Sequence, residues 1–336
     1  MLDAAVPCAA ATRWEALADR ALAGEPPTRE EALSVLRADD EDVLSLLAAA
    51  YRVRRAAFGN KVKLNMLLSA KSGVCPEDCG YCSQSVVSTA PIEKYQLLSR
   101  ETIVAGAHEA WRRKAGTYCI VASGRGPSAR ELREVAAAVR QIKEELPLKV
   151  CACLGLLTGE QALALREAGV DRYNHNLNTS ADHHARITTT HTYEDRVRTV
   201  EAVRSAGISP CSGVIVGMRE ADEQIADVAF ALRELDADSI PVNFLHAIPG
   251  TPLAGVHELD PRRCLKVLCL FRLVCPTKEI RVSGGREVNL RSLQPLALYP
   301  ANAIFIGDYL TTAGQAAAED YRMIEDLGFE IEECAL

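Results

Sequence analysis

Apolar positions along the chain follow two alternating patterns. Short apolar runs rich in β-branched residues, typical of buried strands, alternate with longer stretches whose apolar residues recur every three or four positions, as in amphipathic helices. A helical lead over about 12–58, broken at "GEPPT", precedes this alternation. The strand candidates are 61–69, 117–123, 148–155, 170–177, 208–217, 238–245, 279–285 and 302–308.

The stretches between the strand candidates predict crossover helices, among them 128–146 and 193–207. The second begins after Thr192, and Asp195 three residues later completes a capping-box pattern. Repeated strand–helix units without a linker-like break predict an α/β fold, a single (β/α)₈ TIM-type barrel with an N-terminal helical extension. An open doubly wound sheet is the competing fold.

This interpretation divides the chain into three parts. We expect an N-terminal helical extension over 1–58, the barrel over 59–329 and a C-terminal tail over 330–336. Reactive groups of such barrels gather at the carboxyl ends of the strands and in the loops that follow them. We therefore expect the catalytic and ligand-binding residues at those ends.

Composition narrows the class of protein. The 336 residues are 48% hydrophobic and 25% charged, and no apolar run reaches the roughly 18 residues of a membrane span. Asp3 stands where a secretory peptide would carry positive charge, so we expect a cytoplasmic protein. A net charge of −7 does not indicate the positively charged surface that binds nucleic acid or an anionic membrane. Small-molecule chemistry is favoured.

Twelve cysteines are the main compositional signal. In a long chain without a secretion signal, metal binding or redox work is favoured over a disulfide framework. Cys264, Cys269 and Cys275 fall around a predicted helix and are expected to fill the core. Cys8 and Cys334 lie near the termini and receive no role.

Three cysteines are concentrated in "GVCPEDCGYCSQS", at Cys75, Cys79 and Cys82. Structural zinc sites take four ligands in closed tetrahedral array, and no fourth Cys or His follows closely here. Three thiolates on a four-iron cluster would instead leave one iron open to a small molecule. A zinc knuckle and packed thiols remain the alternatives.

The triplet resembles the signature of the radical S-adenosylmethionine (AdoMet) superfamily, including Tyr81 just before its last cysteine. The resemblance implies a [4Fe-4S] cluster whose open iron binds AdoMet. A second element of that family matches a pattern that flanks the adenine, formed by Gly213, Ile215, Gly217 and Glu220. A third differs, because Ala122, Ser123 and Gly124 replace the usual Gly-Gly-Glu that meets the AdoMet amino group.

Four further residues lie one on each of four predicted strands: Cys119, Cys151, Cys211 and Arg281. Alternate residues of a barrel strand point inward, so the four side chains can converge. An inward arginine is costly unless it meets an anion or a metal-bound sulfide. The alternative is a solvated Arg281 and three small core thiols.

Stretches over about 55–329, including "KVCACLGLL", "DRYNHNLNTS" and "DSIPVNFLHAIPGTPL", resemble the biotin synthase family. The resemblance implies that Cys119, Cys151, Cys211 and Arg281 hold a [2Fe-2S] cluster, one sulfide of which is the sulfur donor. It implies dethiobiotin as substrate, a 5′-deoxyadenosyl radical mechanism with two AdoMet cleavages per turnover, a homodimer, and electrons from flavodoxin or ferredoxin.

"YNHNLNTS" carries Asn174, Asn176 and Asn178 at alternate positions, which predicts that they share a strand face opposite Tyr173, His175 and Leu177. An asparagine offers both donor and acceptor atoms, which suits a cyclic urea or the AdoMet ribose and carboxylate. The resemblance implies substrate contacts at Asn174, Asn176 and Asn243, and AdoMet contacts at Asn176 and Asn178. The family often has Asp where Asn178 stands.

Cys151 and Cys153 occupy alternate positions of one predicted strand, so both can face inward. The resemblance points to Cys151 as the ligand and leaves Cys153 as a small wall residue. Two other functions stay open on the residues themselves: another barrel radical AdoMet enzyme with a different substrate, and a phosphate-binding barrel enzyme that uses "SGGRE" (283–287).

Overall fold

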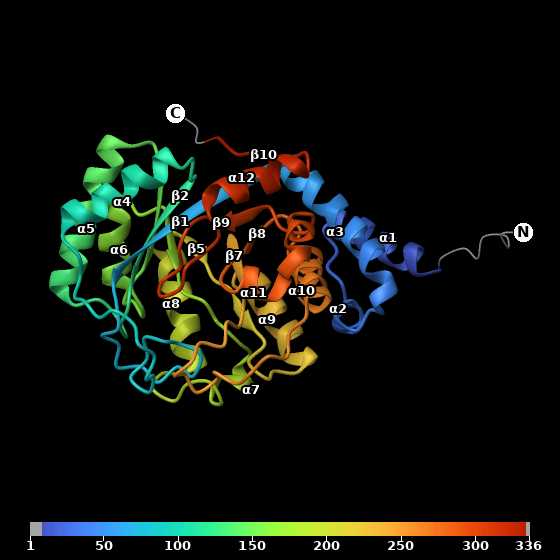
Figure 1. The fold of residues 1–336 in the computed structure, drawn as a ribbon, viewed down its shortest axis with the longest axis horizontal. Coiled ribbons are helices and arrows are strands. Elements are labelled where there is room, and N and C mark those ends of the chain that lie inside the picture. Colours follow the sequence, from blue (N-terminus) through green and yellow to red (C-terminus); the bar gives the residue numbers. More distant parts are fainter. Residues whose placement is uncertain (1–8, 334–336) are drawn as a thin grey trace, which may run out of the picture.

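The computed structural model describes residues 9–333, and its centre is a closed barrel of parallel strands (Figure 1). Strands follow one another around the barrel in chain order, and β1 pairs with β9 to close it. The strands are β1 (Lys61–Lys71), β2 (Thr117–Ala122), β3 (Lys149–Cys153), β4 (Arg172–Asn174), β5 (Ser209–Cys211), β6 (Val214–Val216), β7 (Ser239–Phe244), β8 (Glu279–Val282) and β9 (Ala303–Phe305). The closed barrel confirms the predicted TIM-type fold and excludes the open sheet.

One predicted strand, 208–217, is interrupted and forms two pieces, β5 and β6, which both pair with β7. The interruption falls at Ser212 and Gly213. A Cβ atom at Gly213 would lie 2.0 Å from the carbonyl oxygen of Pro241, so only glycine allows this approach to β7. The barrel thus has eight strand positions, the fifth made of two segments.

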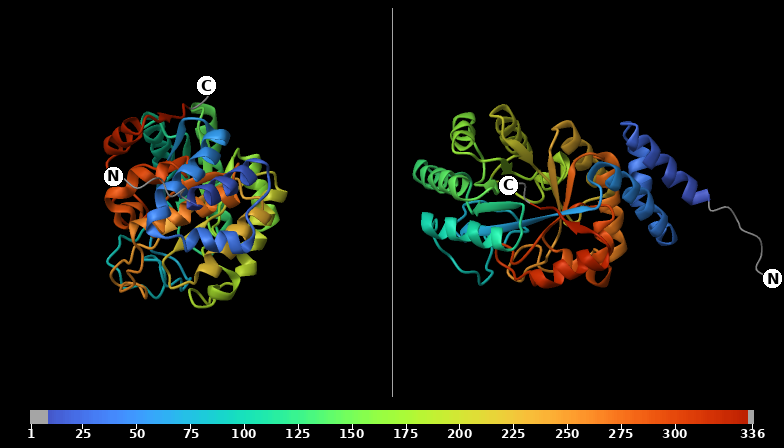
Figure 2. Two further views of the ribbon diagram at one scale, coloured as in Figure 1. Left: turned by 90° about the vertical axis from the view of Figure 1, so that its right-hand side faces the viewer. Right: turned by 90° about the horizontal axis from the view of Figure 1, so that it is seen from above.

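Helices surround the barrel, as the right-hand view of Figure 2 shows. They are α4 (Arg100–Arg112), α5 (Ala129–Glu145), α6 (Gly159–Glu167), α7 (Ala181–His184), α8 (Tyr193–Ser205), α9 (Asp222–Glu234), α10 (Pro261–Val274), α11 (Arg286–Leu290) and α12 (Ala317–Asp326), with the 3₁₀ segment η2 (Arg291–Leu298). The predicted capping box before α8 is confirmed, because Thr192 and Asp195 bond each other's backbone N–H groups. Ser128 and Glu131 form the same motif before α5.

The N-terminal lead forms α1 (Ala9–Leu22), α2 (Arg29–Leu36), a short 3₁₀ turn η1 (Asp40–Asp42) and α3 (Val43–Phe58). These helices lie outside the ring and contact α10 (Figure 2). Since α10 is covered on one side by the barrel and on the other by these helices, it is buried around its circumference from Cys264 to Val274.

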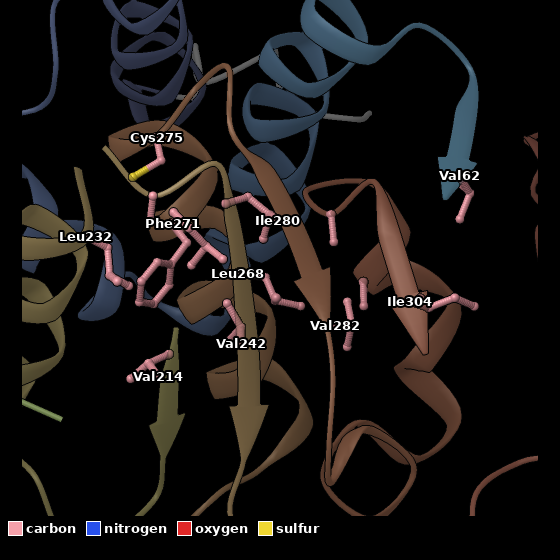
Figure 3. Packing of buried hydrophobic residues seen from close by; sticks show 14 of the residues in the cluster. Val62, Val214, Leu232, Val242, Leu268, Phe271, Cys275, Ile280, Val282 and Ile304 are labelled. Atoms are coloured by element: carbon pink, nitrogen blue, oxygen red, sulfur yellow. The ribbon is translucent and has the colours of Figure 1, made fainter. Parts of the chain in front are cut away.

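Cysteines of α10 fill this core, as predicted. Cys264 and Cys269 are buried within the helix, and Cys275 is buried at its carboxyl end. Figure 3 shows Cys275, Leu268 and Phe271 in the same buried cluster as side chains of β7 and β8. Cys8 and Cys334 lie outside the described residues.

Beyond α12 the chain returns to the barrel. A short strand β10 (Glu330–Ile331) pairs in parallel with the start of β1, with Lys61 opposite Glu330. Among the residues described, no helix combines the length and apolar character needed to cross a membrane.

Candidate active site

A cavity of about 410 Å³ lies at the carboxyl ends of the strands. The loops that follow the strands gather around it along the lower side of Figure 1. The cavity brings together most of the predicted site residues, since its walls include Cys75, Cys79, Tyr81, Cys82, Cys119, Ala122, Ser123, Gly124, Cys153, Asn174, Asn176, Asn178, Ile215, Asn243 and Arg281. A cavity of this volume suits a small ligand and part of a nucleoside.

The cysteine triplet lies in the long loop after β1. Cys79 is buried, while Cys75 and Cys82 are half-buried. Burial raises the pKa of the Cys75 thiol and raises the pKa of Cys82 to about 12. Across residues 9–333 no three His, Cys, Asp or Glu side chains converge as ligands of one metal ion.

The two acids of this loop anchor it to the segment before α8. Asp78 accepts a hydrogen bond from the Thr188 hydroxyl at 2.6 Å and another from the Thr189 N–H at 2.9 Å. Although burial opposes ionisation, these bonds hold the pKa of Asp78 well below its usual range. Glu77 is buried and accepts from Arg125 at 3.1 Å and from His191. The sequence "PEDC" does not by itself predict that these two acids bond residues of the segment before α8 and Arg125.

Tyr81 contacts Asn178 across the cavity wall. Their side chains lie 2.6 Å apart, and in the amide orientation that satisfies both groups Asn178 Oδ1 accepts from Tyr81 Oη. In that orientation it also accepts from the guanidinium of Arg196 at 3.3 Å. Arg196 donates a further bond to the carbonyl of Asn176 at 2.8 Å. Sequence reasoning missed Arg196, which lies on α8 and resembles an ordinary helix-surface cation.

The asparagine stretch departs from the predicted alternation. β4 ends at Asn174, and the next residues leave the strand, so His175 also lines the cavity with Asn174 and Asn176. The prediction that His175 lies on the opposite face was therefore wrong, because alternation holds only while the strand continues. Asn174 donates to Asn176 Oδ1 at 3.0 Å and to Cys211 Sγ at 3.3 Å.

Asn243 is held by backbone on both sides. Its Nδ2 donates to the carbonyl of Val214 at 3.0 Å, and its Oδ1 accepts from the N–H of Gly284 at 3.0 Å. This amide links β7 with β6 and with the loop after β8. The same Nδ2 also donates to the carbonyl of Pro241 at 3.5 Å, so one lone pair of Oδ1 remains for a ligand in the cavity.

Three thiols meet at the floor of the cavity, and one of them, Cys119, lines it. Cys119 and Cys151 are direct partners on β2 and β3, and Cys211 on β5 completes the group. All three are almost fully buried. A hydrogen bond from Cys151, helped by Arg281 and Asn174, lowers the pKa of Cys211 to about 5. Hydrogen bonds with the two other thiols raise the pKa of Cys151.

Cys153 differs from Cys151 in its position. It lines the cavity, and burial raises its pKa to about 12. Cys151 lies outside the cavity wall, within the group of three thiols. The two side chains thus occupy successive levels on one face of β3.

Arg281 lines the cavity beside these thiols, with 1% of its surface exposed. Its Nη2 donates to Glu279 at 2.7 Å and to Ser239 at 2.8 Å. Although burial opposes its charge, the neighbouring Cys211 and Glu279 raise the pKa of Arg281. Sequence reasoning found the arginine but missed Glu279, which precedes it by two residues on β8.

The glycine-rich pattern after β5 has structural roles of its own. Glu220 accepts hydrogen bonds from the N–H groups of Gly217 and Met218, both at 2.6 Å, which closes the turn before α9. Gly217 has a φ of +100°, and a Cβ there would meet Leu259 at 2.7 Å. Of the predicted adenine-flanking residues, Ile215 is the one in the cavity wall.

The "SGGRE" segment borders the same cavity through Gly284 and Gly285. Its arginine, Arg286, is turned away and buried, with Nη2 donating to Asp320 at 2.7 Å. The one cation of the segment is therefore committed to an internal ion pair. This weakens the phosphate-loop alternative.

Comparison with known proteins first identifies the class. The Radical SAM superfamily model matches residues 70–232, and the Biotin and Thiamin Synthesis associated domain matches residues 241–330. The crystal structure of methylornithine synthase (PylB) has the same fold, with a TM-score of 0.83 at 21% identity over 95% of this chain and 98% of that one. A [4Fe-4S] cluster and AdoMet are the cofactors of this class.

Relatives identify the family. Biotin synthase of Geobacillus kaustophilus (strain HTA426) is 66% identical over 319 residues, covering 95% of this chain and 96% of the relative. Biotin synthase of Bacillus subtilis (strain 168) is 62% identical over 320 residues, covering 95% and 96%. The chain belongs to the biotin synthase family. It is an enzyme that inserts sulfur into dethiobiotin to form the thiophane ring of biotin.

Proposed function

We propose that the two groups of thiols divide this reaction between the rim and the floor of one cavity. Cys75, Cys79 and Cys82 hold the [4Fe-4S] cluster at the rim and leave one iron for AdoMet. Their placement on one loop in the wall of the cavity supports this role. Soft thiolates are the ligands that iron–sulfur clusters require.

At the floor, Cys119, Cys151, Cys211 and Arg281 hold a [2Fe-2S] cluster. The observation that carries this assignment is the meeting of three buried thiols with a buried guanidinium whose Nε has no hydrogen-bond partner among the described residues. A buried donor without a partner is costly, and a cluster would supply one. The donor set therefore fits this group.

The surrounding charges also fit. Lys63, Arg172 and Arg281 all pair with one buried carboxylate, Glu279, and Lys63 also pairs with the partly exposed Glu332 at 3.4 Å. Three cations against two carboxylates leave an excess of positive charge, which thiolates and an anionic cluster would balance. Other neutral packings of the thiols would leave that excess uncompensated.

When bound, the clusters and AdoMet supply the 5′-deoxyadenosyl radical and the sulfur, which the protein's own side chains do not supply. The chain's own residues hold the substrate and exclude water. Asn174 Oδ1 and Asn176 Nδ2 remain for a ligand, and one acceptor beside one donor matches the C=O and N–H groups of a cyclic urea. Asn243 offers a further contact, and Cys153 forms the wall above the floor thiols.

For AdoMet we propose contacts from one side of the cavity by Tyr81, Asn176, Asn178 and Ile215, with Gly213, Gly217 and Glu220 shaping the backbone that presents Ile215. The bond between Tyr81 and Asn178 supports this set, since it ties the cysteine loop to the asparagine stretch. Where other radical AdoMet enzymes have Gly-Gly-Glu, Ser123 lines the cavity with a buried hydroxyl that lacks a partner within residues 9–333. That hydroxyl is the proposed acceptor for the AdoMet amino group.

The remaining assignments concern organisation. We propose the three-part division of the chain at 1–58, 59–329 and 330–336, a homodimer, and reduction by flavodoxin or ferredoxin. Exposed Val74 and Val86 beside the cysteine triplet give an electron donor an apolar surface. A cytoplasmic location suits a protein whose thiols must remain reduced.

Anaerobic reconstitution with iron and sulfide, followed by Mössbauer spectroscopy, tests the proposal. We expect two cluster types in one chain, with AdoMet changing the [4Fe-4S] signal and dethiobiotin turnover depleting the [2Fe-2S] signal. A protein that forms biotin with a single cluster type would contradict the assignment. A protein that cleaves AdoMet but leaves dethiobiotin unchanged would favour a different substrate.

A further inference from the structure

Glu279 is a buried carboxylate at the floor of the barrel that bonds side chains of three other strands and one of its own strand. One oxygen accepts from Arg281 at 2.7 Å and from Ser239 at 2.8 Å. The other accepts from Arg172 at 2.7 Å and from Lys63 at 3.0 Å. Only 4% of the residue is exposed. Both oxygens are thus fully used in the interior of the protein.

The position of this carboxylate follows from strand geometry. Glu279 and Arg281 occupy alternate positions on β8, so both side chains point into the barrel at successive levels. Ser239 is the direct partner of Glu279 on β7, and Cys211 is the direct partner of Ser239 on β5. Glu279 therefore lies in register with Cys211 through Ser239, one inward-facing position before Arg281 and nearer the amino end of β8.

The bonds that Glu279 makes leave a defined part of Arg281 for other use. Both hydrogen bonds that this guanidinium donates come from Nη2. Its Nε is buried and has no partner within the described chain. A planar guanidinium fixed through one terminal nitrogen by a carboxylate has little rotational freedom, so its other edge is held in a constant direction.

We propose that Glu279 is a positioning residue for the sulfur-donor centre, which fixes the guanidinium of Arg281 toward Cys119, Cys151 and Cys211. The inference rests on the proposed [2Fe-2S] site and adds a residue that does not itself bind the cluster. Glu279 also reduces the positive charge of the floor, which would otherwise carry three cations from Lys63, Arg172 and Arg281.

The amide variant Glu279→Gln tests the proposal. A carboxylate has two accepting oxygens, whereas the amide has one and presents an N–H₂ group to the cations. We expect a changed [2Fe-2S] Mössbauer and absorption spectrum, a more positive cluster potential because a negative charge is lost, and at least tenfold less biotin per loaded protein. AdoMet cleavage should stay close to the wild-type rate.

A double variant tests whether the effect of Glu279→Gln arises from misfolding or from a change in net charge. Lys63→Met combined with Glu279→Gln removes one cation together with the anion and keeps the net charge of the floor unchanged. We expect this double variant to fold and to keep the altered spectrum, because Arg281 has still lost its carboxylate. Asp320→Asn, at a buried carboxylate that pairs with Arg286, serves as the matched control and should keep the wild-type spectrum.

Wild-type spectra in both Glu279 variants would overturn the positioning role. A wild-type spectrum in the double variant alone would also overturn it, because net charge would then account for the effect. Absence of a [2Fe-2S] signal from the wild-type protein would instead refute the proposed floor cluster. The two failures are therefore distinguishable in one set of samples.

Discussion

Cys119 and Cys151 are direct partners across the β2–β3 pair, and both side chains are buried. Their thiols contact each other and Cys211 at the floor of the cavity, which Cys119 lines, whereas Cys153 lies one level higher in the cavity wall. Two cysteines at alternate positions of one strand thus have different surroundings. The parallel register of the barrel, rather than the spacing of the cysteines, determines which of them joins the group.

This difference predicts opposite effects of two identical substitutions. Cys151→Ser should lose the [2Fe-2S] absorption and biotin formation, because the serine oxygen is a poorer ligand for iron than a thiolate. Cys153→Ser should keep both and reduce the rate by no more than a few-fold. Absorption spectra of the two reconstituted proteins and a biotin assay make the comparison. The reverse result would move the site one level up the strand.

The cysteine triplet gives a second prediction. Cys79→Ala should abolish formation of 5′-deoxyadenosine from AdoMet while the circular dichroism spectrum stays that of wild type, because the loop lies outside the main core. Cys264→Ala, in the buried helix α10, is the matched control and should retain AdoMet cleavage. If the Cys79 variant still formed 5′-deoxyadenosine, the [4Fe-4S] assignment would fail.

Substitution of Arg281 tests whether a guanidinium is needed at the floor of the cavity. Lysine keeps the charge but lacks the second edge of the guanidinium, whose Nε has no partner within residues 9–333 while Nη2 bonds Glu279 and Ser239. We expect Arg281→Lys to weaken or alter the [2Fe-2S] spectrum, with AdoMet cleavage largely retained. Full biotin yield and unchanged spectra in both Arg281→Lys and Arg281→Ala would show that the arginine is no ligand.

Hydrophobic periodicity was enough to predict the barrel, because each strand and helix carries its own local pattern. The capping box at Thr192 and Asp195 is confirmed for the same reason, since a cap depends on residues three positions apart. The interruption between β5 and β6 was not predicted. It depends on the approach of Gly213 to Pro241, which is a contact between strands and leaves no periodic signal.

The charged residues of the site were the hardest to predict. In the sequence, Glu279 resembles an exposed residue at the start of a strand and Arg196 an exposed residue on a helix. In the folded chain both side chains are buried at the site. Arg196 bonds Asn178, which lies outside its helix. Glu279 bonds not only Arg281 on its own strand but also side chains of other strands. Local pattern therefore located the thiols and the asparagines, while the ion network around them required the folded chain.

Asp78 provides a test of the loop anchor. Asp78→Asn removes the charge that accepts bonds from Thr188 and Thr189. Loss of charged hydrogen bonds of this kind costs about 1–3 kcal/mol, so the cysteine loop should be less ordered and AdoMet cleavage about tenfold slower. Asp171→Asn, at the opposite end of the barrel, is the control and should cleave AdoMet normally. Equal rates in both variants would show that the anchor has no role in cleavage.

Cluster assembly should depend on pH differently at the rim and at the floor. Iron binds thiolates, so each thiol that is protonated in the empty site must release a proton on assembly, and apparent affinity then rises with pH. Burial raises the pKa of Cys75 and raises that of Cys82 to about 12, so both are protonated at neutral pH. At the floor, the pKa of Cys211 is lowered to about 5, so this thiol is already ionised.

The sign of the effect follows from these directions. Lowering the pH from 8.5 to 6.5 should weaken assembly at the rim more than at the floor, because Cys75 and Cys82 must both release a proton at the rim, whereas at the floor Cys151, whose pKa is also raised, must release one but Cys211 need not. Mössbauer spectra of protein reconstituted with limiting iron at several pH values would separate the two cluster types. We expect the ratio of [4Fe-4S] to [2Fe-2S] to rise with pH. In Asn174→Ala, which removes a hydrogen bond to the Cys211 thiolate, the floor site should become more pH-dependent and the two slopes should converge. A ratio that stays constant or falls as the pH rises would contradict the thiolate at Cys211.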